Sequence, residues 1–131
     1  MKCKFYILAM GAILLLTSQT PDEPILTKQK DVTIINTTSL ATDIEGYVGQ
    51  TPVKVYIQNG KVLRVEALEN EETPKYFDMV EKGLMKKWNG VPVAKAEKQK
   101  VDVVTGATVS SEAIIENVRR GISYYIYTNK K

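Results

Sequence analysis

The 131-residue sequence contains no histidine, and its single cysteine is Cys3. These absences exclude zinc sites built from thiolate and imidazole ligands, c-type haem, iron–sulfur clusters, and Ser-His-Asp or Cys-His catalysis. They also exclude disulfide bonds within the domain, so its stability must come from the burial of apolar side chains. A redox role would therefore require an organic cofactor.

A concentrated basic surface is also missing, since 18 Lys and Arg residues stand against 15 Asp and Glu residues. Binding to nucleic acid depends on clustered positive charge, so the composition excludes a nucleic-acid partner. The densest basic run is expected to be a solvated loop and contains Lys95, Lys98 and Lys100. The length and the 44% hydrophobic content fit one globular domain.

Residues 1–20 have the order of a signal peptide or N-terminal membrane anchor. Lys2 and Lys4 precede an uncharged run from Phe5 to Leu16, and a polar stretch leads to Pro21. The run is shorter than the roughly 20 residues that a membrane-spanning helix needs. We therefore expect an exported protein on the periplasmic or extracellular side of the membrane, either released by cleavage or held by an uncleaved segment.

The next residues, 21–42, are expected to form a linker or a first strand around the apolar residues 32–35. The clearest element is a hairpin that begins with alternating apolar and polar residues from 53 to 58. Asn59-Gly60 suits the two positive-φ positions of a type I′ turn. The returning strand, residues 62–68, is expected to place on one face the side chains of Leu63, Val65 and Ala67.

Two helices are expected after the hairpin. Thr73 is the predicted N-cap of the first, with Pro74 at its first position and Gly83 as a point of interruption. Its buried face is expected to contain Phe77, Val80, Leu84 and Trp88. The second helix is expected to begin with Ser110 or Ser111 as N-cap and to reach about Tyr125, with a core face formed by Ile114, Val118 and Ile122.

Together these elements predict an α+β fold, in which an antiparallel hairpin-based sheet packs against two or three helices. The domain itself is expected to span residues 43–131. A short buried strand is predicted at 101–104, around Asp102.

Residues 102–111 place this strand, a small-residue turn and a hydroxyl-rich helix start in succession. Unpaired amides at a helix N-terminus attract anions, and Gly106 and Ala107 allow another molecule to approach the backbone closely. Thr108, Ser110 and Ser111 add hydroxyl donors for phosphate oxygens. An ordinary capped helix after a glycine turn is the alternative interpretation.

This segment closely resembles the flavinylation motif of the FMN-binding domain family, D-x-x-(S/T)-G-A-T followed by x-(S/T)-S. The matching residues are Asp102, Thr105, Gly106, Ala107, Thr108, Ser110 and Ser111. The family includes the C subunit of the sodium-pumping NADH:quinone reductase and the G subunit of the Rnf complex. The resemblance implies FMN esterified through its phosphate to Thr108 by a flavin transferase that uses FAD and magnesium.

The resemblance extends over about Asp43 to Tyr125. It includes a Gly-Tyr-x-Gly turn at residues 46–49, an N-G-K-V turn at 59–62, and the segment Glu72-Thr73-Pro74. In relatives the last segment lies beside the flavin ring, which implies that Glu72 and Thr73 contact FMN here. Lys75 stands where a glycine is common in the family.

Threonine is a weak nucleophile, and the motif contains neither histidine nor lysine to activate it. The base and the metal are therefore expected to belong to the transferase. Asp102 is either read by that enzyme or orients the turn by accepting backbone N–H bonds.

The expected function is electron transfer between redox partner proteins or within a membrane complex, with Glu72 disfavouring the anionic reduced flavin. Because no G-x-G-x-x-G dinucleotide motif is present, direct oxidation of NADH is not expected. Two alternatives stay open at this point: a module that binds FMN non-covalently or docks a partner in a redox complex, and a structural domain without a cofactor.

Overall fold

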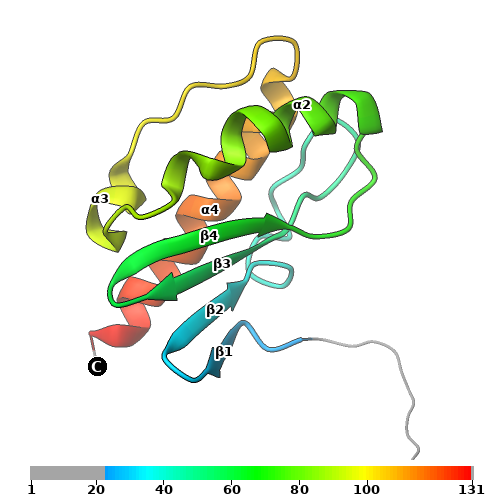
Figure 1. The fold of residues 1–131 in the computed structure, drawn as a ribbon. Coiled ribbons are helices and arrows are strands. Elements are labelled where there is room, and N and C mark those ends of the chain that lie inside the picture. The colour runs from blue at the N-terminus through cyan, green and yellow to red at the C-terminus, as the bar shows by residue number, and fades with distance from the viewer. Residues whose placement is uncertain (1–22, 131) are drawn as a thin grey trace, which may run out of the picture.

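The computed structural model describes residues 23–130, so the expected targeting segment and Cys3 lie outside the described residues. The described chain is a single α+β domain, as predicted, with a four-stranded antiparallel sheet and helices packed against it (Figure 1). Among these residues, no helix combines the length and the apolar character that a membrane span requires. The elements are β1 (Leu26–Gln29), β2 (Val32–Asn36), β3 (Val53–Gln58), β4 (Lys61–Ala67), α2 (Pro74–Leu84), the 3-10 helix η3 (Met85–Trp88), α3 (Val93–Lys98) and α4 (Thr108–Asn129).

The sheet has the order β1-β2-β3-β4, with each strand antiparallel to its neighbour. Strand β2 confirms the strand expected at residues 32–35, and β1 precedes it as an additional edge strand. On β3, alternate side chains are buried, as the pattern predicted. The turn to β4 has φ values of 55° at Asn59 and 74° at Gly60, which confirms two positive-φ residues there.

The predicted face of β4 was wrong at Leu63, which is 44% exposed, whereas Val62 and Val65 are buried. The strand register explains the difference. Ile57 pairs with Val62 while Tyr56 pairs with Arg64, so Leu63 is the extra residue of a β-bulge. The bulge shifts the inward–outward alternation by one position and places Val62 and Val65 on the same side.

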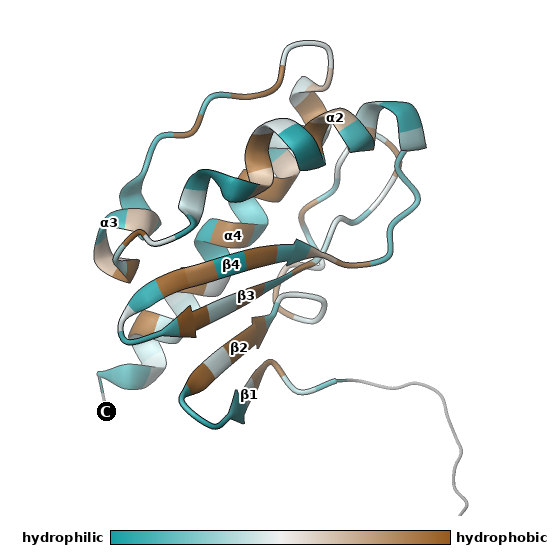
Figure 2. Ribbon diagram, in the orientation of Figure 1, coloured by the Kyte–Doolittle hydropathy of each residue, from teal (hydrophilic) through white to brown (hydrophobic). Residues whose placement is uncertain are grey.

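Helix α4 lies across one face of the sheet and supplies much of the core (Figures 1 and 2). Ile114, Val118 and Ile122 are fully buried, as their spacing predicted. The helix approaches the sheet closely at Gly121, where a Cβ atom would lie 3.3 Å from the Val55 side chain. The helix continues to Asn129, one turn beyond the predicted end.

Helix α2 begins at Pro74 as predicted, and Thr73 occupies the N-cap position, but its side chain forms no capping hydrogen bond. Gly83 does not interrupt the helix, which continues to Leu84 and then tightens into η3. A Cβ atom on Gly83 would lie 3.1 Å from Val104 Cγ2, so glycine permits a close approach there. The predicted buried face is confirmed at Phe77, Val80, Leu84 and Trp88.

Two predictions for the segment between α2 and α4 were wrong. Residues 93–98 form the short helix α3 instead of a lysine-rich loop, because Ala96 packs into the core and anchors this turn. Residues 101–104 form no strand, and Val103 is 37% exposed. This segment packs elsewhere: the Val104 side chain lies against Gly83 of α2, and the Val104 amide donates to the Ser111 hydroxyl instead of to a strand.

Candidate functional site

Helix α4 begins at Thr108, with Ala107 at the N-cap position. The predicted caps, Ser110 and Ser111, lie inside the first turn, so that prediction was wrong. No side chain caps the helix, and within residues 23–130 the amides of residues 108–110 have no hydrogen-bond acceptor. These amides lie at the positive end of the helix dipole, which is the arrangement that binds phosphate oxygens in proteins.

The turn that leads into α4 requires glycine, because Gly106 has a φ of +91°. The Ala107 amide donates to the Val104 carbonyl at 2.9 Å, and the Val104 amide donates to the Ser111 hydroxyl oxygen at 3.0 Å. Asp102 is exposed, and within the described residues its carboxylate accepts no hydrogen bond. The turn is therefore oriented by Ser111, for which the sequence predicted a role as a cap or a phosphate donor.

The carboxylate of Glu72 connects the site to the Gly-Tyr-x-Gly turn. It accepts three consecutive backbone N–H bonds, from Tyr47 at 2.8 Å, Val48 at 2.6 Å and Gly49 at 3.1 Å. The Ser110 hydroxyl donates a fourth, short bond to the same group. Burial would raise the pKa of Glu72, but these bonds from Ser110 and the three amides outweigh it and bring the pKa below its usual value.

The Gly-Tyr-x-Gly turn begins with glycine because Glu72 leaves no room for a side chain at Gly46. A Cβ atom at this position would lie 2.5 Å from Glu72 Oε1, so a larger residue would push the carboxylate away from the amides that it accepts from. The Gly46 amide also donates to the Gly49 carbonyl at 2.7 Å and closes the turn. The Gly-Tyr-x-Gly and Glu-Thr-Pro motifs, separate in the sequence, thus form one hydrogen-bonded unit.

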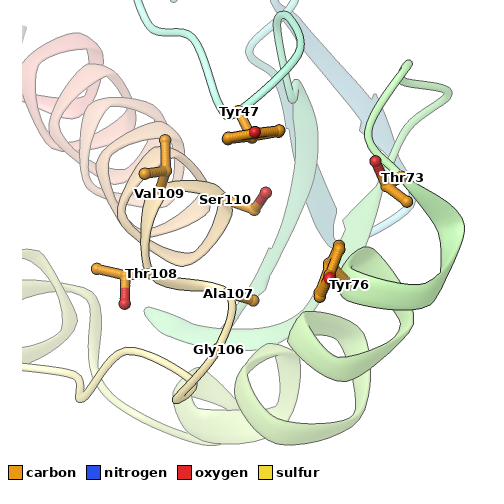
Figure 3. A pocket seen from close by; sticks show the side chains of 8 residues that line it. All are labelled: Tyr47, Thr73, Tyr76, Gly106, Ala107, Thr108, Val109 and Ser110. Atoms are coloured by element: carbon orange, nitrogen blue, oxygen red, sulfur yellow. The ribbon is translucent and has the colours of Figure 1, made fainter.

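A cavity of about 450 Å³ opens beside the start of α4 (Figure 3). This volume falls within the roughly 300–1,000 Å³ of typical ligand sites. The first turn of α4, the start of α2 and the 46–49 turn all contribute to its walls. The lining residues are Tyr47, Thr73, Tyr76, Gly106, Ala107, Thr108, Val109 and Ser110.

The cavity brings together five of the predicted site residues: Thr73, Gly106, Ala107, Thr108 and Ser110. The other four lie nearby in the chain but do not line it: Glu72, Asp102, Thr105 and Ser111. Thr108 is exposed, whereas the Ser110 and Ser111 hydroxyls are buried in internal hydrogen bonds. Among the three predicted phosphate donors, Thr108 therefore has the accessible hydroxyl.

Three residues that line the cavity were not among the predicted site residues: Tyr47, Tyr76 and Val109. Tyr47 is 76% exposed and Tyr76 is 44% exposed. The signal for Tyr47 was its place in the Gly-Tyr-x-Gly motif. No sequence motif contains Tyr76. It lines the cavity because it lies in the first turn of α2, which begins at Pro74.

Comparison with known proteins identifies the family. The sequence profile of the FMN-binding domain matches residues 46–123, which is more than half of the chain. The chain is 32% identical over 114 residues to the G subunit of the ion-translocating oxidoreductase complex of Vibrio parahaemolyticus, covering 76% of this chain and 53% of that protein. It is 28% identical over 109 residues to the protein of the same name from Buchnera aphidicola, covering 72% of this chain and 50% of that protein.

The chain spans about half the length of these curated relatives. The matched residues 46–123 contain the 46–49 turn, Glu72 and the whole segment 102–111, so the match includes every wall of the cavity. The chain belongs to the FMN-binding domain family.

Proposed function

We propose that this protein is an electron-transfer flavoprotein that carries FMN esterified through its phosphate to Thr108. The observation that carries the proposal is the exposed Thr108 hydroxyl at the uncapped start of α4, at the wall of a cavity with two tyrosine rings. Membership of the FMN-binding domain family supports the choice of FMN.

The residues present fit this cofactor. The free amides of residues 108–110 suit the phosphate, and the cavity beside them has partly apolar walls with two tyrosine rings against which a flavin ring can pack. Thr73 adds a hydroxyl at the α2 side of the same cavity. When bound, FMN supplies one- and two-electron redox chemistry.

Attachment requires a second enzyme. The Thr108 Oγ1–phosphorus bond forms, the pyrophosphate bond of FAD breaks, AMP leaves, and the hydroxyl proton passes to a base. None of the residues that line the cavity has a basic side chain, so the base and the magnesium ion come from a flavin transferase. We assign to the exposed Asp102 a role in recognition by that enzyme, since it does not orient the turn.

The curated relatives are subunits of a complex named as an ion-translocating oxidoreductase. On this basis we propose that the redox partners are proteins of a membrane-associated electron-transfer complex. Export to the periplasmic or extracellular side is part of the proposal, supported by the order of charged, apolar and polar residues in 1–20. A phosphoester would retain FMN there independently of binding affinity.

The test is co-expression with a flavin transferase followed by acid precipitation. We expect the flavin to remain with the precipitated protein in the wild type and in a control, Thr42→Val, which removes another exposed threonine hydroxyl. In Thr108→Val we expect no acid-stable flavin.

Two other outcomes favour the alternatives. Release of the flavin into the acid supernatant would identify a non-covalent FMN-binding module. Colourless wild-type protein under the same conditions would favour a structural domain without a cofactor.

A further inference from the structure

We propose that Tyr47 covers the flavin ring and that Glu72 is the positioning residue that holds it there, without contacting the flavin itself. This inference rests on the proposed function and specifies how the ring side of the site is built. Its basis is the hydrogen bonding and burial of Glu72, the exposure of Tyr47 and the connection between the three walls of the cavity.

The carboxylate of Glu72 is fully engaged within the protein. Oε1 accepts from the Tyr47 amide and the Ser110 hydroxyl, and Oε2 accepts from the amides of Val48 and Gly49. The residue is only 5% exposed and does not line the cavity. Direct contact with a flavin would break several charge-assisted bonds, so the effect of Glu72 on the ring is indirect.

The Tyr47 side chain has the opposite character. It is 76% exposed, yet it lines the cavity, and Figure 3 shows its ring on a different side of the cavity from the ring of Tyr76. Large aromatic rings left open at a cavity are typical of surfaces that a ligand covers. A flat isoalloxazine ring can stack against an aromatic ring in this position.

The 46–49 turn belongs to a segment without regular secondary structure, so Tyr47 needs an external support. Glu72 supplies it through three successive amides. The same carboxylate is bonded to Ser110, two residues after Thr108, and Glu72 itself lies two residues before α2. One side chain therefore connects all three walls of the cavity and sets Tyr47 relative to the attachment residue.

The first arm of the test uses flavin-free protein and measures amide hydrogen exchange by NMR. In Glu72→Gln we expect the amides of residues 47–49 to exchange about tenfold faster or more, because the charged acceptor is lost while side-chain size is kept. The matched control is Glu71→Gln, which removes a neighbouring exposed carboxylate that forms no hydrogen bond or ion pair within the described residues. Unchanged exchange in Glu72→Gln would overturn the proposal.

If Glu72→Gln fails to fold, two other exchange measurements test the role of Glu72. Gly46→Ala retains the charge but places a Cβ atom against Glu72 Oε1, so it is expected to produce the same faster exchange. In the wild type itself, the amides of residues 47–49 must exchange more slowly than the amides of exposed residues elsewhere in the 37–52 loop. Rapid exchange of all three in the wild type would overturn the proposal without any variant.

The second arm measures fluorescence per bound flavin. A tyrosine ring in contact with a flavin quenches its fluorescence by donating an electron to the excited state. We expect higher fluorescence in Tyr47→Leu and in Glu72→Gln at equal flavin content, and wild-type fluorescence in Glu71→Gln. Unchanged fluorescence in Tyr47→Leu would show that this ring does not cover the flavin.

The two arms separate this inference from the proposed function. If the wild type carries no esterified flavin, the proposed function fails, while amide exchange in the flavin-free protein still decides the role of Glu72. Free FMN then becomes the probe for Tyr47. Equal FMN binding and equal quenching in the wild type and Tyr47→Leu would overturn the inference.

Discussion

The first turn of α4 and the middle of the same helix are held in place by different forces. In the middle, Ile114, Val118 and Ile122 are fully buried against the sheet. In the first turn, the Ser110 hydroxyl donates to Glu72 and the Ser111 hydroxyl accepts from the amide of Val104. Apolar packing thus fixes the helix on the sheet, and hydrogen bonds fix the segments that surround its exposed end.

The comparison shows how stability and function are divided along one helix. Thr108, the proposed attachment residue, belongs to neither set, since it is exposed and caps nothing. Substitutions in the middle of α4 should therefore change the free energy of unfolding. Substitutions in the hydrogen-bonded segments around its first turn should change both stability and flavin content. Substitution of Thr108 should change flavin content alone. Substitutions in each region test this division, beginning with the largest expected effect on stability.

Ile114→Ala is expected to lower the free energy of unfolding by about 2–5 kcal/mol, because it leaves a cavity under α4. Urea denaturation followed by circular dichroism measures this loss. Flavin content per folded molecule should stay at the wild-type level, since the first turn is intact. A loss below about 1 kcal/mol would contradict the assignment of Ile114 to the core.

Gly106→Val is expected to cost about 1–3 kcal/mol and to prevent flavin attachment. The φ of +91° is unfavourable for a β-branched residue, and a Cβ atom would also lie 3.4 Å from Met79 Cε. Thermal unfolding and acid-stable flavin, measured on the same preparation, check both effects. Wild-type stability together with full flavin loading would show that the turn does not need this conformation.

Acid should weaken the hydrogen-bonded part of the site through Glu72. The pKa of Glu72 is lower in the folded protein than in the unfolded chain, so it contributes stability above the unfolded pKa of roughly 4.3 that is lost as pH falls through the folded pKa. We expect the free energy of unfolding to fall less between about pH 5 and 3 in Glu72→Gln than in Glu71→Gln. Parallel pH profiles for the two variants would contradict the assignment.

Thr108→Val is expected to change the free energy of unfolding by less than about 0.5 kcal/mol, the smallest effect of the series. The side chain is exposed and forms no capping bond, so its removal leaves the first turn unchanged. Chemical denaturation of flavin-free protein measures this effect without a contribution from bound cofactor. A large loss would mean that Thr108 has a structural role that the exposed position does not suggest.

The parts of the fold that were predicted correctly follow from local periodicity. The spacing of Ile114, Val118 and Ile122 and the alternation along β3 each report a face that meets the core. The bulge at Leu63 was missed because it depends on the register between two strands, which local alternation does not contain. The strand predicted at residues 101–104 was wrong for a similar reason, since the contacts of Val104 with Gly83 and Ser111 are tertiary and leave no trace in the local apolar pattern.

At the site, the residue pattern located the turn at Gly106, but the prediction that Ser110 or Ser111 caps the following helix was wrong, because α4 begins at Thr108. Serine is a residue type typical of helix N-caps, but the hydroxyl of Ser110 donates to Glu72 and the hydroxyl of Ser111 accepts from the Val104 amide. These partners are distant in sequence or belong to the backbone of an irregular segment, so no residue pattern indicates them. The cluster of three amides on Glu72 likewise became visible only in three dimensions.

The central claim is that Thr108 carries FMN as a phosphoester. The most direct test is intact mass spectrometry of protein co-expressed with a flavin transferase, followed by peptide mapping. We expect a mass increase equal to FMN less one water molecule, located on the peptide that contains Thr108. An unmodified mass, or the added mass on a peptide without Thr108, would contradict the claim.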